Sequence, residues 1–201
     1  MYIQLDDELW FPDPHLGEED ELVAVGGDLS TNRLLLAYSN GFFPWLSFRH
    51  SKEPHWYCPL DRYVIFPKEI HISHSMKQLI HQNKYIVTFN QFFDGVTRGC
   101  SSVDGRNQQS GAWLGPNIIK SYTELNRLGY AVSVEVWEPQ SMFSLVPNAS
   151  KLALIHLAKT LDGIGGLFID CQFETPHLKS MGGKHISYDK YMEILNKQEL
   201  C

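Results

Sequence analysis

Leu167-Phe168-Ile169-Asp170-Cys171-Gln172 is the stretch on which the fold of this chain depends. It follows Gly165-Gly166, and its three consecutive apolar residues predict a strand that is buried on both faces. Period-two alternation then places the side chains of Asp170 and Gln172 on the same face, at the end of the strand. A carboxylate and a carboxamide held side by side can orient a nucleophilic amine. Asp and Gln also occur at strand ends without a function, where they cap the following turn or are simply solvated.

The segments before this strand predict an α+β protein built on one sheet core. A helix capped by Asn148 runs to about Leu161 and is apolar over more than half of its circumference, so it should be largely buried. Residues 131–137 alternate valines with Ser133, Glu135 and Trp137, as a strand with one polar face does. Further helices are expected at residues 31–39, 73–81, 92–99, 118–128 and 188–196, and further strands at 63–66 and 85–89.

The length and the cysteine pattern indicate a soluble cytoplasmic protein. A chain of 201 residues suits one large domain or two small ones, and we place the boundary between an N-terminal domain, 1–62, and a C-terminal domain, 63–201. The four cysteines lie far apart without a Cys-x-x-Cys pair, which argues against zinc and favours free thiols in a reducing compartment. The sequence has no apolar run of transmembrane length and no basic-then-apolar signal pattern at its N-terminus.

The net charge of −6 is unevenly distributed. Residues 1–28 hold nine of the 23 acidic residues and none of the 17 Lys and Arg, so that the remainder carries 14 acids against 17 bases. With nine histidines in the whole chain, this mildly basic body permits an RNA partner without requiring one.

One predicted helix carries a basic stripe. His74, Lys77, His81 and Lys84 recur at three- and four-residue steps, which places them on one face of the helix that Ser73 can cap. Such a stripe is either a solvated face or a surface that binds phosphates.

An aromatic segment follows the first predicted helix. Phe42-Phe43-Pro44-Trp45 places three aromatic residues around a proline, which would be a liability if exposed. We therefore expect these residues to form a wall, either of the core or of a pocket, and their composition leaves that choice open.

Nine short segments together carry a family resemblance. They span almost the whole chain in this order: Phe11-Pro12-Asp13-Pro14, Val25-Gly26-Gly27-Asp28-Leu29-Ser30, Gly41-Phe42-Phe43-Pro44-Trp45, His71-Ile72-Ser73, Gly111-Ala112-Trp113-Leu114, Ser133-Val134-Glu135-Val136-Trp137, Ser141-Met142-Phe143-Ser144, Asn148-Ala149-Ser150-Lys151 and Ile169-Asp170-Cys171-Gln172. Each segment alone is weak, but nine in this order resemble the leucyl/phenylalanyl-tRNA–protein transferase family.

The resemblance implies an activity and a fold. A member of this family takes Leu or Phe from leucyl- or phenylalanyl-tRNA and joins it to a protein N-terminus that begins with Lys or Arg, which marks the protein for degradation. The implied fold is a small N-terminal domain followed by an acyl-CoA N-acetyltransferase-like domain with a central mixed sheet. Because the ester of the donor is already activated, no cofactor or metal is expected. We expect a monomer without a membrane partner.

The resemblance also implies residue roles. Gln172 would contact the attacking amine, and Asp170 would polarise Gln172 or hold the acceptor; we favour orientation, because a neutral carboxamide is a poor base. The remaining positions serve the donor: an aromatic platform for the 3′-adenosine (Trp45, Trp113, Tyr122), an apolar aminoacyl pocket (Met142, Leu154, Leu157, Ile169) and the tRNA backbone (His74, Lys77, His81, Lys84).

The sequence departs from the family pattern at one point. Between Trp137 and Ser141 the family carries a glycine-rich strand pair ending in a glutamate that helps to bind the acceptor, whereas here only Glu138-Pro139-Gln140 stands there. About eighteen residues are absent, the length of a hairpin of two typical strands. We expect a break in the numbering rather than a true deletion, because loss of the hairpin would strip hydrogen-bond partners from neighbouring strands.

Two other functions compete with this one. A small-molecule acyltransferase that uses coenzyme A would need a glycine-rich pyrophosphate loop before a helix, and Asn148-Ala149-Ser150 contains no glycine. A non-catalytic aminoacyl-tRNA-binding protein becomes the alternative if the deletion is real.

Overall fold

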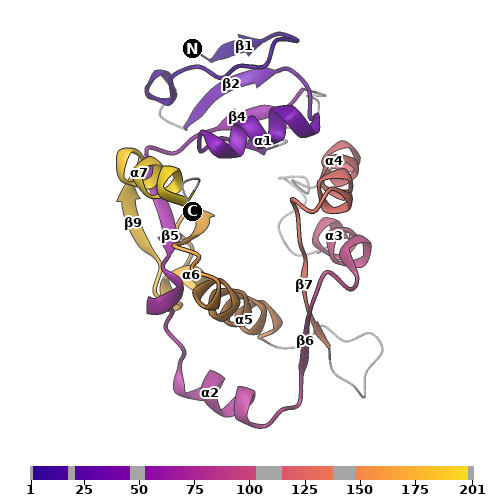
Figure 1. Ribbon diagram of the computed structural model, residues 1–201, viewed down its shortest axis with the longest axis vertical. Coiled ribbons are helices and arrows are strands. Elements are labelled where there is room, and N and C mark those ends of the chain that lie inside the picture. The colour runs from indigo at the N-terminus through magenta and orange to yellow at the C-terminus, as the bar shows by residue number, and fades with distance from the viewer. Residues whose placement is uncertain (1, 18–20, 46–52, 103–114, 138–147, 199–201) are drawn as a thin grey trace. The chain divides into compact units, whose positions relative to one another are not determined.

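The computed structural model describes residues 2–17, 21–45, 53–102, 115–137 and 148–198 (Figure 1). Helices and strands are interspersed along the described chain. In order they are β1 (Ile3–Leu5), η1 (Pro14–Leu16), β2 (Leu22–Gly26), α1 (Thr31–Ser39), β3 (Phe43–Trp45), β4 (His55–Tyr57), β5 (Asp61–Ile65), η2 (Pro67–Glu69), α2 (His74–His81), β6 (Ile86–Phe89), α3 (Phe93–Ser102), α4 (Pro116–Arg127), β7 (Val134–Trp137), α5 (Ala149–Gly163), β8 (Ile169–Gln172), α6 (Pro176–Ser180), β9 (Lys184–Ser187) and α7 (Tyr188–Gln198).

Contacts between residues divide the chain into two compact units. The first unit comprises residues 1–60 and 92–132, and the second comprises residues 61–91 and 133–201. The first unit therefore contains α3 and α4, which come much later in the sequence than its strands. The expected boundary after residue 62 stays a prediction.

The first unit is built on a four-stranded mixed sheet with the order β1-β2-β4-β3. Strands β1 and β2 run parallel, and the two other pairings are antiparallel. Trp56 of β4 is fully buried, and its indole N–H donates a hydrogen bond of 2.9 Å to the carbonyl oxygen of Gly26. Ser30 caps helix α1, because its hydroxyl accepts from the main-chain N–H of Arg33. Outside the sheet, α4 contacts α1 and α3.

The second unit contains two separate antiparallel sheets in its described residues. Strands β8, β5 and β9 form one in that order, and β6 pairs with β7 in the other. We expected a central mixed sheet in the C-terminal domain, but the mixed sheet described here lies in the first unit. The segment that would follow β7, residues 138–147, lies outside the described residues.

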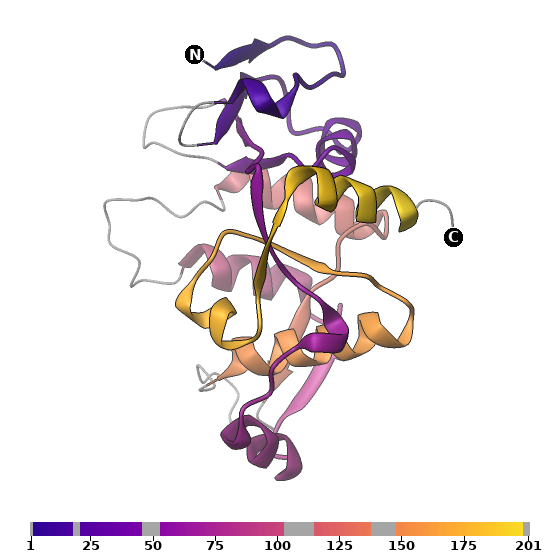
Figure 2. The same cartoon turned by 90° about the vertical axis from the view of Figure 1, so that its left-hand side faces the viewer.

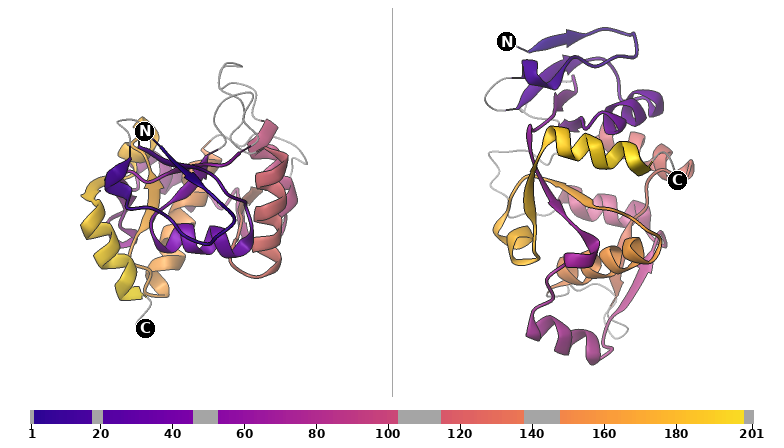
Figure 3. Two further views of the ribbon diagram at one scale, coloured as in Figure 1. Left: turned by 90° about the horizontal axis from the view of Figure 1, so that it is seen from above. Right: turned by 60° about the vertical axis from the view of Figure 1, so that its left-hand side comes forward.

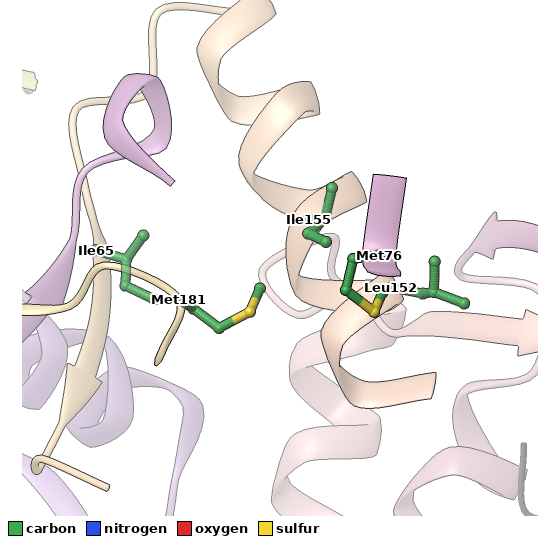
Figure 4. Close-up of a cluster of buried hydrophobic side chains, with 5 residues drawn as sticks. All are labelled: Ile65, Met76, Leu152, Ile155 and Met181. Carbon is green, nitrogen blue, oxygen red and sulfur yellow. The ribbon is translucent and has the colours of Figure 1, made fainter. Parts of the chain in front are cut away.

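Helices α5 and α7 lie on opposite sides of the β8-β5-β9 sheet. Ile65 of β5 belongs to a buried cluster with residues of α2, α5 and the turn after α6 (Met76, Leu152, Ile155 and Met181), shown in Figure 4. Arg62 and Val64 point to the other face by strand alternation. Helix α7 contacts β5, and Figures 2 and 3 show this helix beside the strand. The sheet that carries Asp170 and Gln172 is thus a middle layer.

The polar face of β7 and of the residue before it is turned inward. Ser133 and Glu135 are buried, whereas Val132 is 58% exposed. Glu135 accepts hydrogen bonds from the hydroxyls of Ser133 and Thr88 and from the main-chain N–H of Gln91. Because hydrogen bonds satisfy the carboxylate, a polar face can be the buried one.

The start of α5 differs from the expectation. Asn148 stands at the N-cap position, but it has φ 64° and its side chain makes no capping hydrogen bond. The helix itself is confirmed: Leu152, Ile155 and Ala158 form its buried stripe, and Leu154, Leu157 and Leu161 flank this stripe half-buried.

Candidate active site

Strand β8 is shorter and more exposed than its sequence suggests. It begins at Ile169, and Leu167 is 41% exposed, so the expectation of a strand buried on both faces is wrong. Within the described residues, β8 pairs on one side only, with β5. Ile169 and Cys171 nevertheless pack against the buried cluster on the α5 side of the sheet.

The end of β8 does not alternate regularly. Asp170 lies opposite Val64 and Gln172 lies opposite Tyr63, so one residue of β8 is left over as a bulge. Gln172 has φ +66°, a left-handed conformation that costs a residue with a Cβ about 1–2 kcal/mol. Alternation therefore cannot place Asp170 and Gln172 on the same face. Surrounding contacts hold this turn in its strained conformation.

Asp170 makes those contacts with both oxygens of its carboxylate. Oδ1 accepts a hydrogen bond of 2.8 Å from the main-chain N–H of Gln172. Oδ2 accepts one of 3.3 Å from the hydroxyl of Tyr191 and lies 3.8 Å from Nε of Arg62. Asp170 thus holds the backbone of Gln172 and thereby determines where its carboxamide begins. Sequence reasoning missed Arg62 and Tyr191, because neither belongs to a recognisable motif.

The loop after Gln172 is fastened by a chain of ionisable side chains at the surface. His185 of β9 bridges two carboxylates, with Nδ1 2.8 Å from Asp61 and Nε2 2.9 Å from Glu174. Glu174 also forms an ion pair of 2.9 Å with Lys179. The hydrogen bond that His185 donates to Glu174, followed by the charge of Asp61, raises the pKa of His185, and the same bond lowers the pKa of Glu174.

The aminoacyl-pocket residues are only partly described. Leu154 and Ile169 are brought together, since both pack against the same buried cluster. Leu157 is half-buried on α5. Met142, like Trp113 of the expected aromatic platform, lies outside the described residues. The pocket itself stays a prediction.

The other two platform residues belong to the first unit. Trp45 ends β3, is 37% exposed and stands edge-to-face with Tyr57, with 5.6 Å between ring centroids. Tyr122 lies on α4, where its hydroxyl is hydrogen-bonded to that of Tyr38, and burial raises its pKa. Gln172 belongs to the second unit, so a site that uses all three residues stays a prediction.

The basic stripe is confirmed in part. Ser73 caps α2 by accepting from the main-chain N–H of Met76, and His74, Lys77 and His81 are exposed along this helix. Lys84 is exposed as well, but it lies three residues beyond the end of α2. The helical period therefore does not place it on the same face as the other three residues. The structure therefore puts three of the four residues on one helix.

A hollow in the first unit was not anticipated from the sequence. Its volume is about 500 Å³, and it is lined from the start of α1 and from α4 (Gly27, Asp28, Leu29, Ser30, Thr31, Pro54, Asn117, Lys120, Ser121 and Glu124). None of the site residues expected from the sequence lines it. Among the described residues, no helix is long and apolar enough to cross a membrane, and no three His, Cys, Asp or Glu residues are grouped as metal ligands.

These observations define a class of protein: a two-unit α/β protein in which a strand of the second unit ends in a strained polar turn. Residues 64–140 and 139–196 match the family described as "Leucyl/phenylalanyl-tRNA protein transferase", and residues 27–60 match the N-terminal domain of the same family. The chain belongs to the leucyl/phenylalanyl-tRNA protein transferase family.

Individual relatives resemble the chain over nearly its full length. It is 41% identical to a leucyl/phenylalanyl-tRNA–protein transferase of Flavobacterium psychrophilum, over 96% of this chain and 99% of the relative. It is also 41% identical to the enzyme of the same name from Syntrophobacter fumaroxidans, over 96% of this chain and 88% of the relative. It is 38% identical to the enzyme of the same name from Shigella dysenteriae, over 94% of this chain and 87% of the relative.

The family match also bears on the segment between Trp137 and Ser141, where the sequence departs from the family pattern. It comes in two parts that meet at residues 139–140, and the alignment with the Flavobacterium relative runs over 211 positions, more than the 201 residues of this chain. The family match is therefore divided at the place where the resemblance implies a missing hairpin, and the alignment with this relative contains positions that this chain lacks. The break in the numbering expected between Trp137 and Ser141 falls on residues outside the described ranges and stays a prediction.

Proposed function

We propose that this chain transfers leucine or phenylalanine from its charged tRNA to the N-terminal amine of a protein that begins with Lys or Arg. Family membership supports the reaction class. One local observation supports the site: Gln172 is fixed in a left-handed turn by the carboxylate of Asp170. A strained polar residue that surrounding contacts hold in place is typical of functional sites.

The reaction is the aminolysis of an ester. The lone pair of the amine attacks the carbonyl carbon of the donor, a C–N bond forms, the C–O bond to the 3′-ribose breaks, and the proton released by the amine passes to the ribose oxygen. Catalysis of this step is mainly the alignment of the amine with the carbonyl. The carboxamide oxygen of Gln172 accepts from the amine N–H and directs its lone pair, and Asp170 keeps Gln172 in place.

Donor binding is assigned to the remaining residues. The 3′-adenosine stacks on Trp45, Trp113 and Tyr122, and the leucyl or phenylalanyl side chain enters a pocket formed by Met142, Leu154, Leu157 and Ile169. The tRNA backbone lies along His74, Lys77, His81 and Lys84, three of which are exposed on α2 and the fourth just after it.

A transfer assay with leucyl-tRNA and a peptide that begins with Arg tests this proposal. Gln172→Ala should lower kcat about a hundredfold, because a misplaced nucleophile costs that much, while leaving the affinity for leucyl-tRNA nearly unchanged. Asp170→Ala should act in the same direction. Gln91→Ala and Asp162→Ala remove the same side-chain types at exposed positions of the same unit and should leave transfer unchanged.

The outcomes separate the alternatives. Transfer at the wild-type rate in both Gln172→Ala and Asp170→Ala would remove these residues from the site. A wild-type chain that binds leucyl-tRNA but forms no peptide bond is the result expected of a non-catalytic binding protein. A peptide that begins with Glu serves as the acceptor control, because the proposal requires Lys or Arg.

The proposal includes the fold and the setting. We propose that residues 63–201 have the acyl-CoA N-acetyltransferase type of fold, that residues 1–62 form the smaller N-terminal domain, and that the protein works as a monomer in the cytoplasm. The antiparallel β8-β5-β9 sheet with α5 and α7 on its two sides supports the first point. The separate N-terminal family match at residues 27–60 supports the second.

A further inference from the structure

The turn at Gln172 depends on two side chains that lie outside β8. Arg62 is the second residue of β5 and is completely buried, and Tyr191 lies in the first half of α7 and is almost completely buried. The guanidinium carbon of Arg62 is 4.7 Å from the centroid of the Tyr191 ring, within the range of a cation–π contact. The second oxygen of Asp170 lies within reach of both residues, as described above.

The two oxygens of Asp170 therefore have different tasks. Oδ1 holds the main chain of Gln172, and Oδ2 is held by Tyr191 and Arg62. A carboxylate with only one oxygen fixed can rotate about its side-chain torsions, whereas one fixed at both oxygens cannot. The left-handed conformation of Gln172 is thus tied through Asp170 to β5 and α7.

We infer that Arg62 and Tyr191 are positioning residues: they fix the Asp170 carboxylate so that it holds the Gln172 turn in the conformation needed for transfer. The inference rests on the proposed function in one respect, namely that Gln172 directs the acceptor amine. Neither residue touches a substrate in this scheme, and both act through Asp170.

Tyr191 offers a clean separation of packing from positioning. Its ring packs on Arg62 and edge-to-face on Phe168, with 5.1 Å between ring centroids, while its hydroxyl contacts Asp170. Tyr191→Phe removes only the hydroxyl, so the contacts between α7 and the sheet remain. A role confined to packing would leave the reaction unchanged in this variant.

The first experiment measures transfer with Tyr191→Phe. We expect kcat to fall about tenfold while KM for leucyl-tRNA stays within about twofold, because alignment and not binding is lost. Tyr130→Phe makes the same change at a tyrosine that is 63% exposed, in the other unit, and should behave as wild type. An unchanged kcat in Tyr191→Phe would overturn the inference.

A double-mutant cycle tests whether Tyr191 acts through Asp170. If it does, Asp170→Ala combined with Tyr191→Phe should be no more than about twofold slower than Asp170→Ala alone, because the contact is already absent. Full additivity of the two losses would show that Tyr191 acts by another route.

A third measurement does not depend on activity. Exchange of the Gln172 main-chain amide with solvent, followed by NMR, should be several times faster in Tyr191→Phe than in wild type, because the carboxylate that accepts from this N–H is less firmly held. Arg62→Lys keeps the charge but loses the planar guanidinium, and it should speed exchange in the same way. Unchanged exchange in both variants would overturn the inference.

The failure of one proposal is distinguishable from that of the other. If the wild-type chain transfers nothing but the Gln172 amide loses protection in Tyr191→Phe, the proposed function fails and the positioning contact stands. If transfer requires Gln172 but neither kcat nor amide exchange responds to Tyr191→Phe, the positioning role fails and the proposed function stands.

Discussion

Cys171 lies between Asp170 and Gln172, and this position by itself would suggest that its thiol is a nucleophile. Its side chain argues against that role, because it packs against the buried cluster that contains Ile65 and Ile155. Burial, followed by the charge of Asp170, raises the pKa of the Cys171 thiol to about 12. At neutral pH the thiolate is therefore scarce, and the reaction derived above does not use it.

Alkylation of the folded protein tests this reasoning about Cys171. We expect iodoacetamide to label the exposed Cys100 and to leave Cys171 and the buried Cys58 unlabelled near pH 8, because only the thiolate reacts. Cys171→Ala should retain transfer within about twofold, at the cost of some stability from the lost packing. Rapid labelling of Cys171, or loss of transfer in Cys171→Ala, would contradict this view.

At the scale of elements, β9 and the loop after β8 are joined by His185. The hydrogen bonds to Glu174 and Asp61 raise the pKa of His185 above its ordinary value of 6.5. A raised pKa in the folded state means that the stabilisation is fully present below the ordinary pKa and is lost as the pH rises through the raised one. Because the side chains are largely exposed, we expect the effect to be small.

Because the pKa of His185 is raised, the loss of stability caused by His185→Ala should depend on pH. Urea unfolding of wild type and variant should give a larger difference in free energy near pH 6 than near pH 9, since only the protonated imidazole pairs with the two carboxylates. His81→Ala, on the exposed face of α2, is the matched control and should show no such trend. A difference that grows toward high pH would disprove the ion-pair account.

Helix α2 is the second element with an expected role. Its exposed Lys77, together with Lys84 just beyond its end, should contact phosphates of the tRNA. The double variant Lys77→Ala, Lys84→Ala should weaken leucyl-tRNA binding and lower the slope of log affinity against log salt by about one to two units. Lys159→Ala, on the exposed side of α5, should leave the slope unchanged. An unchanged slope in the double variant would make α2 a solvated surface.

At the scale of the whole molecule, the two units are assigned different tasks. The first unit supplies Trp45 and Tyr122, which are expected to hold the 3′-adenosine, and the second supplies Asp170 and Gln172, which are expected to align the acceptor. If this division is right, damage to the first unit should appear mainly in binding and damage to the turn mainly in turnover.

Trp45→Ala tests the division of tasks. Loss of base stacking is worth about 1–3 kcal/mol, so KM for leucyl-tRNA should rise roughly tenfold or more with little change in kcat. Trp10→Ala is a suitable control, because it removes an exposed tryptophan from the same unit. A fall in kcat at unchanged KM would assign Trp45 to the chemistry and not to binding.

Much of the local structure followed from the sequence, because it depends on neighbours a few residues apart. Ser73 marks the start of α2, and Gly129, with φ +86°, follows α4 as its stop. The short strands β5 and β6 and the helix α7 lie within a few residues of their expected places. The nine family segments could also be recognised in the sequence, and the match of residues 27–60 and 64–196 to the family confirms what they indicate.

Only the tertiary structure decided how the turn is built. The contact between Asp170 and Arg62 joins residues that are far apart in the sequence, and the bulge that turns Gln172 out of register arises from pairing with β5. In the same way, Ser133 and Glu135 are buried because Thr88 and Gln91, from the neighbouring strand and the turn after it, supply hydrogen bonds that the strand pattern does not reveal. Sequence patterns report which backbone conformation each residue favours locally, whereas burial and strain depend on which distant side chain arrives to satisfy a polar group.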